Sequence, residues 1–141
     1  MRKYCLVAVI FFLSLSLAFS QTDEWRIAKS THFIIYYKNA SEDFIEKLVE
    51  ESEDYYNEIA ENLGFKRYDF WLWDNRAKIY IYDDAQGYQA ATGQPAWSMG
   101  SVVPKDKVIS AFPGIRGFFE TILPHEIGHI IFREFVGFDN N

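Results

Sequence analysis

The chain has 141 residues, 49% of them hydrophobic, and its formal net charge is −6 at pH 7. An acidic surface disfavours binding to nucleic acid and to anionic membranes, so we expect no nucleic-acid partner. The length allows one modest hydrophobic core, and because repeats and internal linkers are absent from the sequence we expect a single domain.

Residues 1–20 have the pattern of a secretory signal peptide. Arg2 and Lys3 give a charged start, Cys5 to Leu17 is nearly all apolar, and Ala18-Phe19-Ser20 has the small-x-small pattern of a cleavage site. We therefore expect cleavage after Ser20 and a secreted or periplasmic protein without a membrane span. An uncleaved N-terminal membrane anchor is the alternative, although the apolar run is short for a span of about 20 residues.

The expected mature domain covers residues 21–141. Loss of the leader removes the only cysteine and two positive charges, which changes the formal net charge from −6 to −8. Residues 21–30 form a polar lead-in, and Thr31–Tyr37 is the first predicted strand. Both of its faces are apolar, which is typical of a strand covered on both sides. We interpret His32, at its start, as a satisfied or exposed side chain.

The clearest predicted helix covers 41–63. Ser41 is its expected N-cap, Gly64 ends it, and apolar residues recur at helical spacing along one side. The opposite side is acidic, and we interpret it as a solvated face, with a calcium or cationic-substrate site as the alternative. Its acidic residues are Glu46, Glu50, Glu51, Glu53, Asp54, Glu58 and Glu61.

Residues 65–112 alternate between strands and turns. We expect an aromatic loop or hairpin arm over 65–76, a strand over 78–82, and a short turn or helix over 85–91 that is capped by Asp83 and Asp84. Two further strands, 97–103 and 107–112, flank Pro104-Lys105-Asp106. Such a pair commonly forms the antiparallel edge of a sheet, and 97–103 is the expected edge strand.

The last predicted helix begins near 117–120 and contains His125-Glu126-Ile127-Gly128-His129, an HExxH pattern. Histidines four residues apart share one helix face, so both can bind one zinc ion at about 2.0–2.1 Å. Glu126 lies about 100° round the helix from His125, which suits a general base acting on water better than a ligand. Pro124 is a candidate for a kink just before the histidines.

Apolar neighbours of the motif predict that this helix is buried. They are Ile122, Leu123, Ile127, Ile130, Ile131 and Phe132. Unpaired polar side chains are costly in a core, and a metal ion would supply the partner for both histidines. The alternative is that the histidines merely hydrogen-bond within the core.

The run Leu123-Pro124, the HExxH motif and Ile130-Ile131 resembles the gluzincin-type metallopeptidases of the peptidase MA-like group. The resemblance implies zinc-dependent hydrolysis of a peptide or protein substrate, with Glu126 as general base and His125 and His129 as metal ligands. It also implies a sheet edge that pairs with an extended peptide. Metzincins require Gly and His where this chain has Phe132 and Phe135, so that subgroup is excluded.

The order of elements predicts an α+β layer. We expect the N-terminal half of a zincin-like domain: a mixed or antiparallel sheet, a long amphipathic helix and a buried HExxH helix. Two other interpretations stay open. One is a non-catalytic secreted binding module on the same fold that uses aromatic residues such as Trp71, Trp73, Trp97 and Tyr88. The other is an inactive truncated fragment.

The third zinc ligand does not follow from the motif. Glu134 lies about 140° and 180° round the helix from His129 and His125, and Glu120 has the mirror-image offsets, so both point away. Asp139 could return only through a chain reversal after Gly137. The resemblance implies a glutamate on a following helix, which we expect beyond Asn141. We therefore expect the 141-residue chain to bind zinc weakly and to lack peptidase activity alone.

Overall fold

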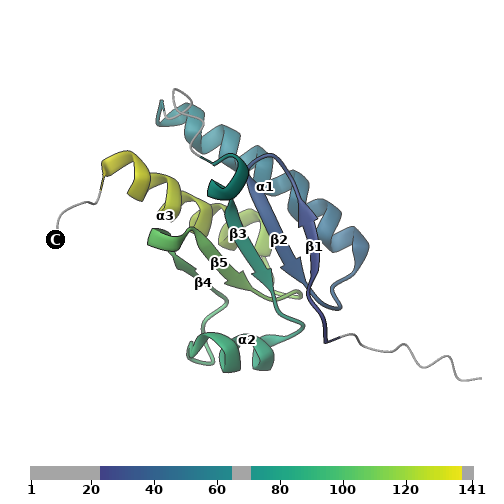
Figure 1. The fold of residues 1–141 in the computed structure, drawn as a ribbon. Helices are drawn as coiled ribbons and strands as arrows, with labels where there is room; N and C mark the ends of the chain where they lie inside the picture. Colours follow the sequence, from purple (N-terminus) through teal and green to yellow (C-terminus); the bar gives the residue numbers. More distant parts are fainter. Residues whose placement is uncertain (1–22, 65–70, 138–141) are drawn as a thin grey trace, which may run out of the picture.

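A five-stranded mixed sheet forms the centre of the structure, a computed structural model that describes residues 23–64 and 71–137 (Figure 1). Its strand order is β1-β2-β3-β5-β4. The strands β2, β3 and β5 are parallel, whereas β1 and β4 are antiparallel edge strands. The strands are β1 (Arg26–Lys29), β2 (Phe33–Tyr37), β3 (Ala77–Ile81), β4 (Gly100–Val103) and β5 (Val108–Ala111).

Three α-helices accompany the sheet: α1 (Glu42–Asn62), α2 (Ala85–Thr92) and α3 (Leu123–Val136). Helices α1 and α3 contact each other over one face of the sheet, and α2 follows β3 at the end of the strands (Figure 1). Short 3₁₀ turns cover Trp73–Asn75 and Pro104–Asp106, and a π-helical turn covers Phe118–Ile122. No helix among the described residues is long and apolar enough to cross a membrane. The prediction of a mixed α and β architecture is confirmed at this level.

The core lies between the sheet and the two long helices. Helix α1 begins after Ser41, whose hydroxyl accepts a hydrogen bond from the Phe44 N–H group at 3.3 Å. Its buried stripe includes Leu48 and Tyr56, and it faces the alternate residues Phe33 and Ile35 of β2. The predicted amphipathic helix is therefore confirmed.

The expectation that the first predicted strand is covered on both faces is wrong for the described part of the chain. Ile34 and Tyr36 lie on the face opposite α1 and are only partly buried. Tyr36 stacks on Tyr80 of β3 with ring centroids 4.7 Å apart, and the Trp25 ring meets Tyr80 edge-on. Aromatic side chains of neighbouring strands thus shield one another on this face.

The predicted polar lead-in also contains a strand. Arg26–Lys29 pairs with β2 as the edge strand β1. Only Ile27 and Ala28 of this strand are apolar, so the sequence shows no alternation of apolar and polar residues that would predict it. The strand forms through its main-chain pairing with β2. Arg26 forms an ion pair with Glu42 and lies over the Tyr37 ring.

Two boundaries near the predicted site differ from expectation. Strand β4 begins at Gly100 and not at the predicted residue 97. Trp97 lies in the preceding turn, with 80% of its surface exposed. The predicted helix begins as the π-helical turn Phe118–Ile122 and continues as α3, with Pro124 in the first turn of α3. Residues 65–70 of the predicted aromatic loop lie outside the described residues, while Trp71 is fully buried.

Candidate metal centre

Helix α3 presents one side to the core and the other to solvent. Leu123, Ile127, Ile130 and Ile131 are buried, and this stripe fixes the rotation of the helix. His125 and His129 lie on the opposite, exposed side. The prediction of a buried HExxH helix is therefore wrong for the histidine side, where Phe132 is also 52% exposed.

The two histidine rings converge. Their Nε2 atoms lie 3.0 Å apart, and the rings are nearly perpendicular, at 87°, with centroids 4.5 Å apart. Two nitrogens that bind one tetrahedral zinc ion at about 2.0–2.1 Å are about 3.3 Å apart. The pair therefore fits a shared metal with little rearrangement. Without a metal, the same 3.0 Å contact is a hydrogen bond between the two rings, in which the donor depends on the tautomer.

Glu126 is the buried member of the motif. Its side chain points toward β4, since a Cβ atom placed on Gly100 would lie 3.6 Å from Glu126 Oε1. Burial raises the pKa of Glu126 above its usual value, and the nearby charges of His125 and His129 oppose that rise. A carboxylate of this kind can accept a proton closer to neutral pH than an exposed one.

No third histidine, cysteine or carboxylate joins the pair within residues 23–64 and 71–137. Glu134 is engaged elsewhere, because it accepts a hydrogen bond from Trp71 Nε1–H and pairs with Lys107 Nζ at 3.3 Å. Glu120 is exposed on the π-helical turn. Asp139 lies outside the described residues.

A contact between β4 and the motif helix was not predicted from the sequence. An ideal Cβ atom at Gly100 would lie 2.9 Å from Ile122 Cγ2, closer than carbon atoms normally approach. The absence of a side chain thus lets the edge strand lie directly against Glu126 and the residue before α3. A lone glycine in an apolar run signals close backbone approach, and this signal was present in the sequence.

The Gly100 carbonyl takes part in a chain of hydrogen bonds. The Ser98 hydroxyl donates to the Gly100 carbonyl at 3.0 Å, and Tyr88 Oη lies 2.8 Å from Ser98 Oγ. Tyr88 on α2 is fully buried, and it packs against Phe112. The chain of hydrogen bonds therefore connects α2 to the strand that covers Glu126.

Gly100→Ala should lower the free energy of unfolding. Overpacking costs about 1–3 kcal/mol, which exceeds the gain of about 0.4–1 kcal/mol from restricting the unfolded chain. Urea unfolding of the variant and of Ser101→Ala, whose side chain lies on the other face of β4, measures the effect. An unchanged midpoint in Gly100→Ala would show that β4 and Ile122 separate without cost.

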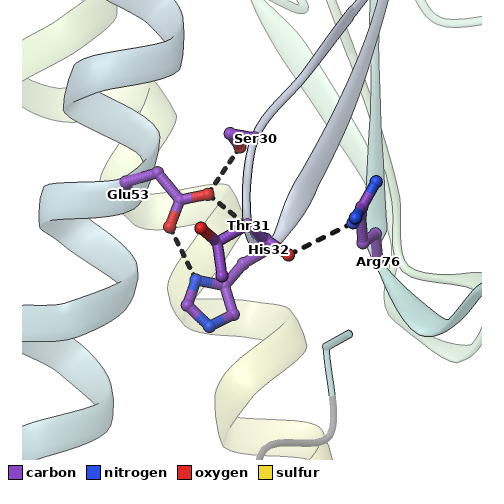
Figure 2. Close-up of polar contacts among 5 residues, drawn as sticks. All are labelled: Ser30, Thr31, His32, Glu53 and Arg76. Atoms are coloured by element: carbon purple, nitrogen blue, oxygen red, sulfur yellow. Dashed lines mark hydrogen bonds and ion pairs between the residues drawn. The ribbon is translucent and has the colours of Figure 1, made fainter. Parts of the chain in front are cut away.

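A second polar cluster joins the turn before β2 to α1, and Figure 2 shows its hydrogen bonds converging on Glu53. Glu53 accepts from the His32 N–H group at 2.8 Å, from His32 Nδ1–H at 2.6 Å and from the Ser30 hydroxyl. The His32 ring stacks on Tyr56, with centroids 3.9 Å apart. Ser30 bonds to the carboxylate and not to the histidine, so the three residues do not form a serine–histidine–acid triad.

The cluster confirms the interpretation of His32 as a satisfied side chain and corrects one residue of the acidic face. Glu53 was expected to be solvated, but its side chain is only 20% exposed. Burial raises its pKa, but the hydrogen bonds from His32 and Ser30 outweigh that effect, so the pKa lies below its usual value of 4.5. No local sequence pattern links the partners, which are 21 residues apart.

Glu53→Gln should destabilise the fold at pH 7 by about 1–3 kcal/mol, because a charged acceptor is lost. The lowered pKa stabilises the folded state above about pH 4.5, and this contribution is lost as the pH falls through the folded-state pKa. Urea unfolding at pH 7 and pH 3 should therefore show a smaller difference at pH 3. The exposed Glu50→Gln control should change stability by less than about 0.5 kcal/mol. Equal effects of both variants would contradict the assignment.

Comparisons of the chain with family models, with curated proteins and with solved structures find no match in any of the three. The resemblance to gluzincin-type peptidases therefore stays a prediction that depends on the motif and its flanks. Function is inferred from the residues of the site and their geometry.

Proposed function

We propose that the chain carries the catalytic helix of an exported zinc metallopeptidase of the gluzincin type, on a zincin-like fold. The observation that carries the proposal is the convergence of His125 Nε2 and His129 Nε2 on the exposed side of α3, 3.0 Å apart. Export would depend on the leader, residues 1–20, which lies outside the described residues.

Each residue of the motif has a separate role in this proposal. His125 and His129 would hold zinc through their Nε2 atoms. Bound zinc would lower the pKa of a water molecule and polarise the scissile carbonyl. Glu126 accepts a proton from the attacking water and delivers it to the leaving amine nitrogen as the peptide C–N bond breaks. Its raised pKa brings it nearer to the pH at which it must exchange that proton.

The free edge of β4 supports a peptide substrate. Lys107 and Ala111 turn their carbonyls toward β3, where they accept from Lys78 N–H at 2.8 Å and Tyr82 N–H at 2.9 Å. Main-chain groups alternate in direction along a strand, so Val108 and Ser110 face β4.

The register then assigns the remaining groups. Val108 and Ser110 lie opposite Val103 and Ser101, which are therefore the hydrogen-bonded pairs. The main chain of Gly100 and Val102 therefore faces outward, and of these groups the Gly100 carbonyl already accepts from the Ser98 hydroxyl. An extended peptide could add to this edge by main-chain hydrogen bonds, whatever its side chains.

The third ligand is part of the proposal. A catalytic zinc normally has three protein ligands, so the proposal requires a third ligand beside His125 and His129, which a glutamate on another segment or Asp139 would supply. The protein with a complete zinc site should cleave a mixture of peptides, as detected by mass spectrometry. A chelator should stop cleavage and added zinc should restore it. Cleavage that persists in chelator would contradict the proposal.

The rival function is a non-catalytic binding module. It is favoured by Trp73 and Trp97, which are 81% and 80% exposed, but Trp71 and Tyr88 are fully buried and offer no binding surface. Glu126→Gln separates the two functions, because it should abolish hydrolysis and leave partner binding intact.

A further inference from the structure

A pocket of about 470 Å³ lies beside the turn between β1 and β2, and the residues that line it do not belong to α3 or β4. Its lining residues are Ser30, Thr31, Leu72, Trp73 and Arg76. They come from two segments that the parallel pairing of β2 with β3 brings together at the starts of these strands. The histidine pair does not contribute to this pocket.

The cation of the pocket is Arg76. Its Nε–H group donates to the Thr31 carbonyl at 3.2 Å, which fixes the guanidinium beside the turn (Figure 2). Among the residues that the structure describes, no carboxylate forms an ion pair with Arg76; the nearby Glu53 is engaged by His32 and Ser30. The planar donor groups beyond Nε are therefore available to a carboxylate, which a guanidinium binds in a bidentate manner.

The aromatic wall of the pocket is Trp73. Its backbone has φ of +55°, a left-handed conformation that is rare for a bulky side chain. The same residue is 81% exposed, so the strained conformation gains no core packing in return. Strain of this kind tends to occur where a side chain is held for a ligand.

We propose that this pocket binds a carboxylate-bearing ligand with an apolar or planar body. Arg76 binds the carboxylate, the Trp73 ring packs against the body, and Thr31, which also lines the pocket, supplies a hydroxyl as a further hydrogen-bonding group. The C-terminal residue of a peptide and an acidic sugar share this chemistry. The site is independent of zinc and of the proposed hydrolysis.

The test uses N-acetylphenylalanine, its neutral amide and glucuronate, each titrated into the protein while the Trp73 indole N–H signal is followed by NMR. At least one acid should bind saturably and at least about tenfold more tightly than the amide, because charge-assisted hydrogen bonds are lost in the amide. Tighter binding of N-acetylphenylalanine indicates a peptide terminus, and tighter binding of glucuronate indicates an acidic sugar.

Variants complete the test. Arg76→Lys keeps the charge but loses the planar fork, and Trp73→Ala removes the wall; each should weaken binding of the acid about tenfold or more, measured for Trp73→Ala by calorimetry. Trp97→Ala removes an equally exposed tryptophan elsewhere and should leave binding unchanged. Absence of saturable binding in the millimolar range, equal binding of acid and amide, or unchanged binding in both pocket variants would overturn the proposal.

Discussion

Glu126→Gln should lower kcat for peptide hydrolysis by about 10²- to 10⁴-fold in the protein with a complete zinc site, while zinc content stays the same. Glutamine preserves the size of this buried side chain but cannot accept the proton of the attacking water. Turnover of a peptide mixture and elemental analysis of the metal measure the two effects separately. Glu120→Gln, on the exposed π-helical turn before α3, is the matched control and should retain activity. Activity of Glu126→Gln above about a tenth of wild type would contradict the general-base role.

His125→Ala and His129→Ala should each weaken zinc binding by more than about 100-fold in the protein with a complete three-ligand site. Changes to groups that merely orient a ligand already cost about 10- to 100-fold, and these substitutions remove a ligand itself. Competition with a chromophoric chelator measures the affinity. Both side chains are exposed, so the fold should be unaffected, and circular dichroism checks this point.

The third histidine of the chain provides the control for that experiment. His32→Gln should leave zinc affinity unchanged, because the His32 ring is bonded to Glu53 and stacked on Tyr56. Wild-type zinc affinity in both His125→Ala and His129→Ala would mean that the metal, if bound, lies elsewhere.

The elements that carry a local signal could be predicted from the sequence. The apolar stripe and the Ser41 cap predicted α1, the dense apolar run predicted β2, and the Pro104–Asp106 turn predicted the antiparallel pair β4 and β5. Strand β1 has little apolar alternation, and its pairing with β2 becomes visible only in three dimensions. The partial burial of Ile34 and Tyr36 among the described residues could not be predicted either, because both side chains are apolar whether or not another element covers them.

In the candidate site, too, the local features could be predicted from the sequence and the contacts between distant segments could not. His125 and His129 are one helical turn apart, so their shared face follows from helix geometry alone. The contact between Gly100 and Glu126, and the Tyr88–Ser98 hydrogen bond that holds β4, join segments distant in the chain. Glu53 was predicted wrongly, because the helical pattern placed it on the solvated acidic face. That pattern gave no indication that Ser30 and His32 would bond to its carboxylate.

A crystal structure of the zinc-soaked protein, with anomalous data at the zinc edge, tests the central claim most directly. We expect a peak about 2.0–2.1 Å from both His125 Nε2 and His129 Nε2, with Glu126 outside the ligand set. A peak only at surface carboxylates such as those of α1, with the two histidine nitrogens still 3.0 Å apart, would contradict it.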